Sequence, residues 1–259
     1  MEYKLEEIQT GKAVYYYDVI DSTNTEAKRL AAAGACEGTL VLAEAQIAGR
    51  GRRGRSWESP KGTSIYMSLL LRPDISSDRA SMITLVMGLS VVEGLEQAFG
   101  VKTQIKWPND VVLNKKKLVG ILTEMGLQGT KIDYIVIGIG INVNTVNFPE
   151  ELVDKATSLR LELGYPVERE LLIAAVMKAF EQNYQEFLKT QDLSGVKTRY
   201  EAVMANQNQP VRVLQPGCEY EGTAVGINTM GELLVEKMDG TCEAVYAGEV
   251  SVRGLYSYV

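Results

Sequence analysis

The chain has 259 residues, a formal net charge of −6 and no histidine. A hydrophobic fraction of 46% and a charged fraction of 23% fit a globular chain with a sizeable core and exclude an intrinsically disordered one. Without histidine, Ser–His and Cys–His nucleophile pairs are excluded. The acidic net charge also argues against a protein that coats nucleic acid non-specifically.

The cysteines and the apolar stretches indicate in which cellular compartment the protein works. Cys36, Cys218 and Cys242 form no CxxC pair, so we expect no zinc site. The longest apolar runs, such as Met82–Val92, are only about half a bilayer span. The N-terminus has no apolar stretch of the kind found in signal peptides. We therefore expect a reduced, cytoplasmic protein that has no membrane association.

Alternating helix and strand signals fill the first four fifths of the chain. A capping box at Thr23–Glu26 predicts the start of the first helix, which stops at Gly34. In chain order, the expected elements are a helix to about 33, strands at 39–46 and 64–71, a long core helix at 78–99, strands at 102–107, 110–113, 117–125 and 132–143, and helices at 168–189 and 194–205.

The pattern changes near residue 207. Only short strands separated by Gly and Asp turns follow, at 211–214, 219–227, 232–236, 242–247 and 250–253. That spacing predicts a small β-barrel. We therefore predict two domains, 1–206 and 207–259.

Gly49–Arg55 is the most unusual segment, with four arginines in seven residues. It matches G-x-G-x-x-G, but Trp57, Pro60 and a strand follow it, whereas a dinucleotide-binding loop must open a helix. Guanidinium groups bind carboxylate and phosphate bidentately, so we expect an anionic ligand that orders this loop. A solvated basic loop and an RNA-binding segment are the alternatives.

Two further segments carry candidate site residues. Lys106–Asp110 turns sharply at Pro108, and Asp110 is either a ligand of Mg²⁺ or nucleotide, or a turn residue that bonds its own backbone. Lys117 is the best placed of three consecutive lysines to point inward. In Gly138–Asn142, alternation puts both glycines and the asparagine on one face, which accommodates either a ligand or a close-packed helix.

Together these segments closely resemble the biotin protein ligases. The resemblance is carried, in order, by Asp21–Asn24, Ala43–Gln46 leading into Gly49–Trp57, Lys106–Asp110, Lys117–Leu122, Gly138–Asn142 and Gly248–Arg253. It implies an α+β fold with a mixed β-sheet flanked by helices, related to class II aminoacyl-tRNA synthetases, and a C-terminal SH3-like β-barrel.

The resemblance also implies a two-step reaction. Biotin and ATP, with Mg²⁺, give biotinyl-5′-AMP and pyrophosphate, and biotin then passes to a lysine of a biotin carboxyl carrier domain. No tightly bound prosthetic group is implied. The first step needs positioning and charge stabilisation, which a chain without histidine can supply.

Residue roles follow from the same resemblance. Lys117, Arg50 and Arg52 would be catalytic, and Asp110 would be a magnesium ligand. Biotin would contact Ser22, Thr23, Asn24, Gln46, Gly49, Arg50, Arg52, Lys117, Gly120, Gly138 and Gly140. The nucleotide would contact Arg52, Arg55, Trp57, Asn109, Asp110, Lys117 and Asn142, although packing is the favoured role of Trp57.

Some family members carry an N-terminal winged helix-turn-helix and act as repressors. Only 21 residues precede Ser22, so we expect no repressor function and no DNA partner. A lipoate-type ligase or acyltransferase is the nearest alternative enzyme, and an RNA-binding module is the non-enzyme alternative. Both a monomer and a homodimer are compatible with the sequence.

Overall fold

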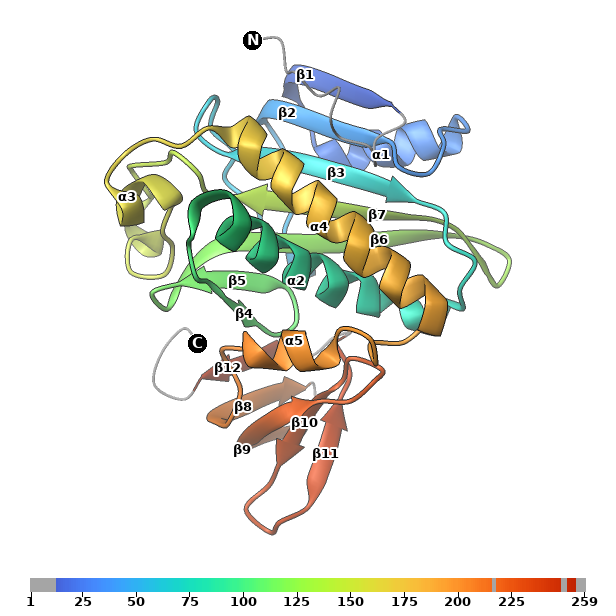
Figure 1. Ribbon diagram of the computed structural model, residues 1–259, viewed down its shortest axis with the longest axis vertical. Helices are drawn as coiled ribbons and strands as arrows, with labels where there is room; N and C mark the ends of the chain where they lie inside the picture. The colour runs from blue at the N-terminus through green and yellow to red at the C-terminus, as the bar shows by residue number, and fades with distance from the viewer. Residues whose placement is uncertain (1–12, 216–217, 248–250, 255–259) are drawn as a thin grey trace.

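The computed structural model describes residues 13–215, 218–247 and 251–254, and its main feature is a seven-stranded mixed sheet (Figure 1). The strand order is β1-β2-β3-β7-β6-β5-β4, with β1 and β2 parallel and the other neighbours antiparallel. The strands are β1 (Val14–Ile20), β2 (Leu40–Gln46), β3 (Ile65–Leu71), β4 (Gln104–Lys106), β5 (Asp110–Leu113), β6 (Lys116–Gln128) and β7 (Lys131–Ile141).

Helices cover both faces of this sheet. The helix α1 (Thr23–Ala32) packs on one face, over a small core that includes Val41, Leu70 and Val136. The long helices α2 (Ala80–Phe99) and α4 (Arg169–Thr190) cross the other face, where the main core lies (Figure 1). Two short helices complete the set, α3 (Leu159–Leu163) and α5 (Lys197–Ala202).

The segment Ser77–Phe99, which contains α2, is long and apolar enough by composition to cross a membrane. It is, however, mostly buried inside the protein, with the sheet on one side and α4 on the other. A helix covered on two sides is expected to be apolar nearly all round, so its hydropathy follows from its place in the core.

A second, five-stranded antiparallel sheet forms the C-terminal part. Its order is β11-β10-β9-β8-β12, built from β8 (Gln209–Gln215), β9 (Cys218–Ile227), β10 (Leu233–Glu236), β11 (Cys242–Val245) and β12 (Ser251–Gly254). The Trp107 indole links the two sheets, because its Nε1–H donates to Gly231 O over 3.0 Å. The α+β class is confirmed. The domain boundary near 207 stays a prediction; it falls just before β8.

Two local expectations differ from the structure. The sequence analysis assigns no element to Val14–Ile20, which forms the edge strand β1. The capping box is wrong, because α1 begins at Thr23 with Ser22 as N-cap and no side chain caps it. The Thr23 hydroxyl instead contacts Gln46 and Ser68, so tertiary contacts outweigh the local capping preference.

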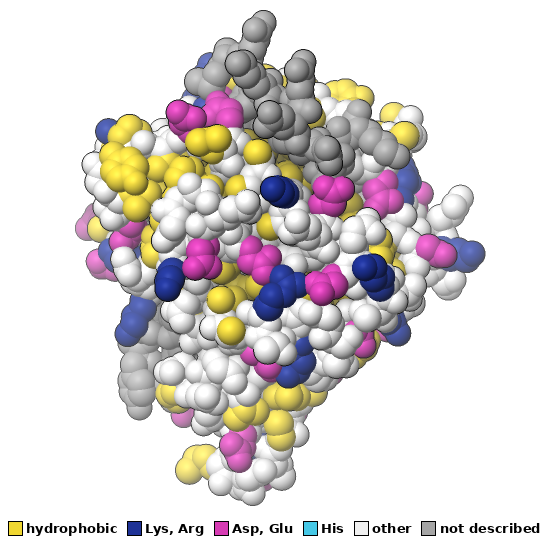
Figure 2. Space-filling model, in the orientation of Figure 1, with side chains coloured by type: hydrophobic (Ala, Val, Ile, Leu, Met, Phe, Trp, Pro, Cys, Tyr) yellow, Lys and Arg dark blue, Asp and Glu magenta, His cyan; other side chains and the backbone are white. Residues whose placement is uncertain are grey.

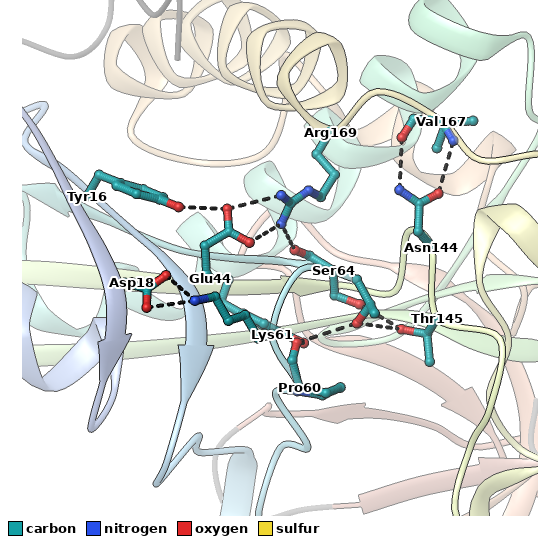
Figure 3. A network of polar contacts seen from close by, with 12 residues as sticks. Tyr16, Asp18, Glu44, Pro60, Lys61, Ser64, Asn144, Thr145, Val167 and Arg169 are labelled. Carbon is teal, nitrogen blue, oxygen red and sulfur yellow. Dashed lines mark hydrogen bonds and ion pairs between the residues drawn. The ribbon is translucent and has the colours of Figure 1, made fainter. Parts of the chain in front are cut away.

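A buried ionic network ties the start of α4 to the sheet (Figure 3). Arg169 binds Glu44 with two hydrogen bonds, of 2.9 and 3.0 Å, and also donates to Ser64 O. Tyr16 donates to the same carboxylate, and burial together with this bond raises the pKa of Tyr16 to about 12. The backbone carbonyl of Glu44 accepts from the Gly62 N–H, so the network also holds the end of the Gly/Arg loop, the segment 49–62 between β2 and β3.

Candidate functional site

A pocket opens where helix α1, strands β6 and β7 and the Gly/Arg loop meet. Its walls combine polar side chains from the start of α1 and the end of β2 with basic side chains of the loop and of β6. Its lining is Ser22, Thr23, Asn24, Gln46, Arg50, Gly51, Arg52, Trp57, Tyr66, Asn109, Lys117, Gly120, Ile121, Leu122, Gly138, Ile139 and Gly140.

Twelve of the sequence-predicted residues therefore lie around one pocket, although they come from well-separated stretches of the chain. Four others do not line it: Gly49, Arg55, Asp110 and Asn142. Gly49 begins the loop, and a Cβ atom there would come within 2.4 Å of Trp57 O. Asn142 is buried, and its backbone bonds Leu118 and Leu159. Arg55 is exposed at the tip of the loop.

The glycines explain how the pocket is shaped. A Cβ atom on Gly138 would lie 2.1 Å from Asn24 Oδ1, so the start of α1 can approach β7 only because residue 138 is glycine. At Gly120 and Gly140 a Cβ atom would meet the Trp57 indole, at 2.7 and 2.6 Å. The glycine face is thus partly covered by a helix and partly by the loop, and packing is the role that the structure shows for Trp57.

Lys117 points inward, as the sequence predicts. Its ammonium nitrogen lies 2.7 Å from Asp110 Oδ1 and 5.3 Å from the centroid of the Trp57 ring. Asp110 also accepts from Asn109 Nδ2. Within the described part of the chain, no three His, Cys, Asp or Glu side chains form a metal-binding group. A Mg²⁺ ion at Asp110 would therefore need its other oxygen ligands from bound phosphate and water.

Arg52 connects the loop to the C-terminal sheet. Its guanidinium donates to Asn109 Oδ1 over 2.8 Å and to Ala247 O, just beyond β11, over 2.6 Å. Burial lowers the pKa of Arg52, and the nearby Asp110 carboxylate partly offsets that effect. The expectation that an anion orders the loop stays a prediction. Of the Gly248–Arg253 motif, residues 248–250 lie outside the described residues.

The sequence analysis misses several residues at this site. Gly51, Tyr66, Ile121, Leu122 and Ile139 line the pocket, while Ser68 and Glu124 bond to the lining residue Asn24. The three aliphatic residues lie beside predicted glycines, so the predicted strands could have located them. Ser68 and Glu124 are single polar residues inside apolar strands, and that exception to the strand pattern is the only local signal they give.

Comparison with known proteins agrees with this geometry. Residues 16–142 match the Biotin/lipoate A/B protein ligase family, and residues 208–253 match the Biotin protein ligase C terminal domain. The chain is 39% identical over 244 residues to the bifunctional ligase/repressor BirA of Bacillus subtilis, and the match covers 93% of this chain and 74% of that protein.

Two further relatives match over nearly their whole length. The biotin–[acetyl-CoA-carboxylase] ligase of Paracoccus denitrificans is 33% identical over 239 residues, which is 90% of this chain and 98% of that protein. The structure of the biotin protein ligase from Aquifex aeolicus in complex with biotin and ATP superposes with a TM-score of 0.82 at 33% identity, covering 94% of this chain and 99% of that one. The chain therefore belongs to the biotin protein ligase family.

Proposed function

We propose that the protein activates biotin with ATP and then transfers it to a lysine of a biotin carboxyl carrier domain. The observation that carries this proposal is the pocket itself, whose lining combines uncharged hydrogen-bonding side chains with three cationic ones, Arg50, Arg52 and Lys117. Such an arrangement fits a ligand with an uncharged polar head and an anionic tail.

In the first step, a carboxylate oxygen of biotin attacks the α-phosphorus of ATP, and the bond to the pyrophosphate oxygen breaks. Lys117, Arg50 and Arg52 would stabilise the negative charge on the phosphoryl oxygens. Asp110 would hold the Lys117 ammonium in place through their ion pair and would share Mg²⁺ with the ATP phosphates. The acceptor lysine then attacks the mixed anhydride, and AMP leaves.

The biotin ring would lie against Ser22, Thr23, Asn24 and Gln46, and its tail along Gly120, Gly138 and Gly140. Gly49 would shape the loop that covers it. The nucleotide would extend past Lys117 toward Asn109 and Asn142, with Arg55 and Trp57 closing over it. Because Trp57 rests on two of these glycines, the indole would have to shift when the tail enters.

Calorimetric titration tests the proposal. We expect tight binding of biotin, no comparable binding of lipoate, and ATP- and biotin-dependent labelling of a carrier domain. Lipoate binding without biotin binding would move the chain to the lipoate-type alternative. Binding of neither would favour the nucleic-acid alternative. On the face seen in Figure 2, however, the described basic and acidic side chains are interspersed and form no basic strip of the kind that nucleic-acid binding uses.

Replacing Arg52 should release the intermediate. In Arg52→Ala the loop loses its contacts with Asn109 and Ala247, so we expect biotinyl-5′-AMP to leave the enzyme roughly tenfold faster or more. Chromatography of free adenylate measures this. Arg53→Asn is the matched control, since Arg53 is exposed in the same loop and asparagine tolerates its φ of 58°. Equal release from both variants would contradict a role for Arg52 in retention.

We also propose a cytoplasmic enzyme that acts as a monomer or a homodimer. That these 259 residues bind no operator DNA stays a prediction, which a gel shift with a biotin-operon operator tests.

A further inference from the structure

A row of hydrogen-bonded side chains runs from strand β6 to the wall of the pocket. It starts at Glu124 on β6, where Asn24 Nδ2 donates to Glu124 Oε2 over 2.8 Å. Asn24 Oδ1 lies 2.6 Å from Ser68 Oγ, which lies 2.8 Å from Thr23 Oγ1. Asn24, Ser68 and Thr23 are each at most 4% exposed, so water cannot readily replace these bonds.

The Glu124 end of the row can only accept hydrogen bonds. Burial by itself would raise the pKa of Glu124, but the bonds from Lys28 and Asn24 outweigh burial and lower it. Lys28 Nζ lies 2.8 Å from the second carboxylate oxygen. An ionised carboxylate offers no proton, so the Asn24 amide must turn its NH₂ group toward Glu124. The carbonyl oxygen of Leu122, 3.3 Å from the same nitrogen, requires the same orientation.

The number of protons and the distances together assign a direction to the later bonds. Asn24 Oδ1 faces Ser68 as an acceptor, so Ser68 donates its single hydroxyl proton to Asn24. Thr23 Oγ1 has one proton and two oxygen neighbours, Ser68 Oγ at 2.8 Å and Gln46 Oε1 at 3.2 Å. The shorter contact takes the proton, because two lone pairs facing each other at 2.8 Å would repel more strongly than two at 3.2 Å. What Thr23 Oγ1 presents to the pocket is then a lone pair.

The other end of the row is fixed by a backbone group. The Thr23 backbone N–H donates to Gln46 Oε1 over 2.9 Å, which turns the Gln46 NH₂ group away from Thr23. One Nε2–H donates to Ser59 Oγ over 2.9 Å. Both Thr23 and Gln46 line the pocket, so it offers an acceptor at Thr23 beside a donor at Gln46.

We propose that Glu124 is a positioning residue for ligand specificity, which acts through Asn24 and Ser68 to hold Thr23 Oγ1 as a hydrogen-bond acceptor. This inference rests on the proposed function, because a cyclic urea offers an N–H to an acceptor and a carbonyl to a neighbouring donor. A dithiolane ring offers neither, so it would leave the acceptor at Thr23 and the donor at Gln46 without a match in the ligand. Glu124 thus contributes to selection of biotin although it lines no part of the pocket.

The variant Glu124→Gln tests this directly. Lys28 attracts the amide oxygen of the new residue, so its NH₂ group faces the NH₂ group of Asn24. The Asn24 amide relieves this clash by flipping, which gives up its bond to Leu122 O; Ser68 then donates to Thr23, and Thr23 to Gln46 Oε1. We expect the dissociation constant for biotin to rise about tenfold or more, and KM for biotin to rise with kcat little changed. Lys28→Met is the matched control, because it removes the ion pair but leaves an acceptor at Glu124; it should bind biotin as the wild type does.

Asn24→Asp combined with Glu124→Gln should restore most of the lost affinity. The carboxylate introduced at position 24 accepts both from the amide introduced at position 124 and from Ser68, so the row regains its direction. A purely structural role of Glu124 predicts no such rescue. Unchanged biotin affinity in Glu124→Gln, or an equal loss in Lys28→Met, would overturn the proposal. Wild-type protein that binds no biotin would instead refute the proposed function.

A ligand probe needs no mutation. Two cyclic carbamate analogues of biotin each replace one ureido N–H by oxygen. We expect the analogue that loses the N–H facing Thr23 to bind wild-type protein about tenfold more weakly than biotin, or worse. Affinity equal to that of biotin for both analogues would overturn the acceptor role of Thr23.

Discussion

Lys117→Ala should lose roughly 10²–10³-fold in the rate of adenylate formation, which corresponds to about 3–4 kcal/mol of transition-state stabilisation. The physical reason is that the Lys117 ammonium is a cation at the junction of the proposed biotin and nucleotide sites, held there by Asp110. Removing it leaves the charge that develops on the phosphoryl oxygens without a partner. Biotin-dependent exchange of pyrophosphate into ATP measures this step alone.

Lys116→Ala is the matched control for that experiment. Its ammonium donates to Val153 O on the surface, on the opposite side of the strand from Lys117. We expect its exchange rate to be that of the wild type. If Lys117→Ala kept nearly normal exchange, the charge-stabilising role would have to be assigned to the arginines of the loop.

Arg169→Met should be the most destabilising single change. Arg169 and Glu44 are 8% and 7% exposed, and the substitution removes both hydrogen bonds that the Arg169 guanidinium donates to this buried carboxylate (Figure 3). Breaking a buried pair in this way costs about 3–5 kcal/mol, so the midpoint of thermal unfolding should fall by on the order of 10 °C. Urea titration of the free energy of unfolding measures the loss.

Two further variants show whether burial of the ion pair causes the loss of stability expected in Arg169→Met. The double variant Glu44→Leu/Arg169→Met removes both charges and should be more stable than Arg169→Met alone. Arg212→Met breaks the pair with Glu221, which is about half exposed on the C-terminal sheet, and should change stability little. A similar loss in Arg169→Met and Arg212→Met would contradict the burial argument.

Most of the fold could be predicted from the sequence, because its long helices and strands carry clear periodicity. The core helix α2 and the helix α4 are both expected within a few residues of their observed bounds. The strand β1 is not, since it is a sheet edge in which exposed and half-buried residues do not alternate, and three of its seven residues are consecutive tyrosines. Edge strands of this kind lack the pattern on which prediction depends.

The site could be predicted in part, as far as local motifs extend. Glycines, arginines and the Lys106–Asp110 turn are unusual enough to be noticed without a structure. The partners that orient them are not, because a bond such as that between Asn24 and Glu124 joins residues 100 positions apart. The capping-box error has the same origin: a local rule applied to Thr23 cannot include partners on β2 and β3.

The two tryptophans give this protein an intrinsic optical reporter. Trp107 is buried, with its indole N–H bonded to Gly231, so its emission should stay constant when ligand binds. Trp57 lies in the Gly/Arg loop, against two glycines and beneath the Lys117 cation, so its surroundings change with any movement of that loop. Because the chain contains only these two tryptophans, the change in tryptophan emission on adding a ligand reports the surroundings of Trp57, and stopped-flow fluorescence can time that change without a label.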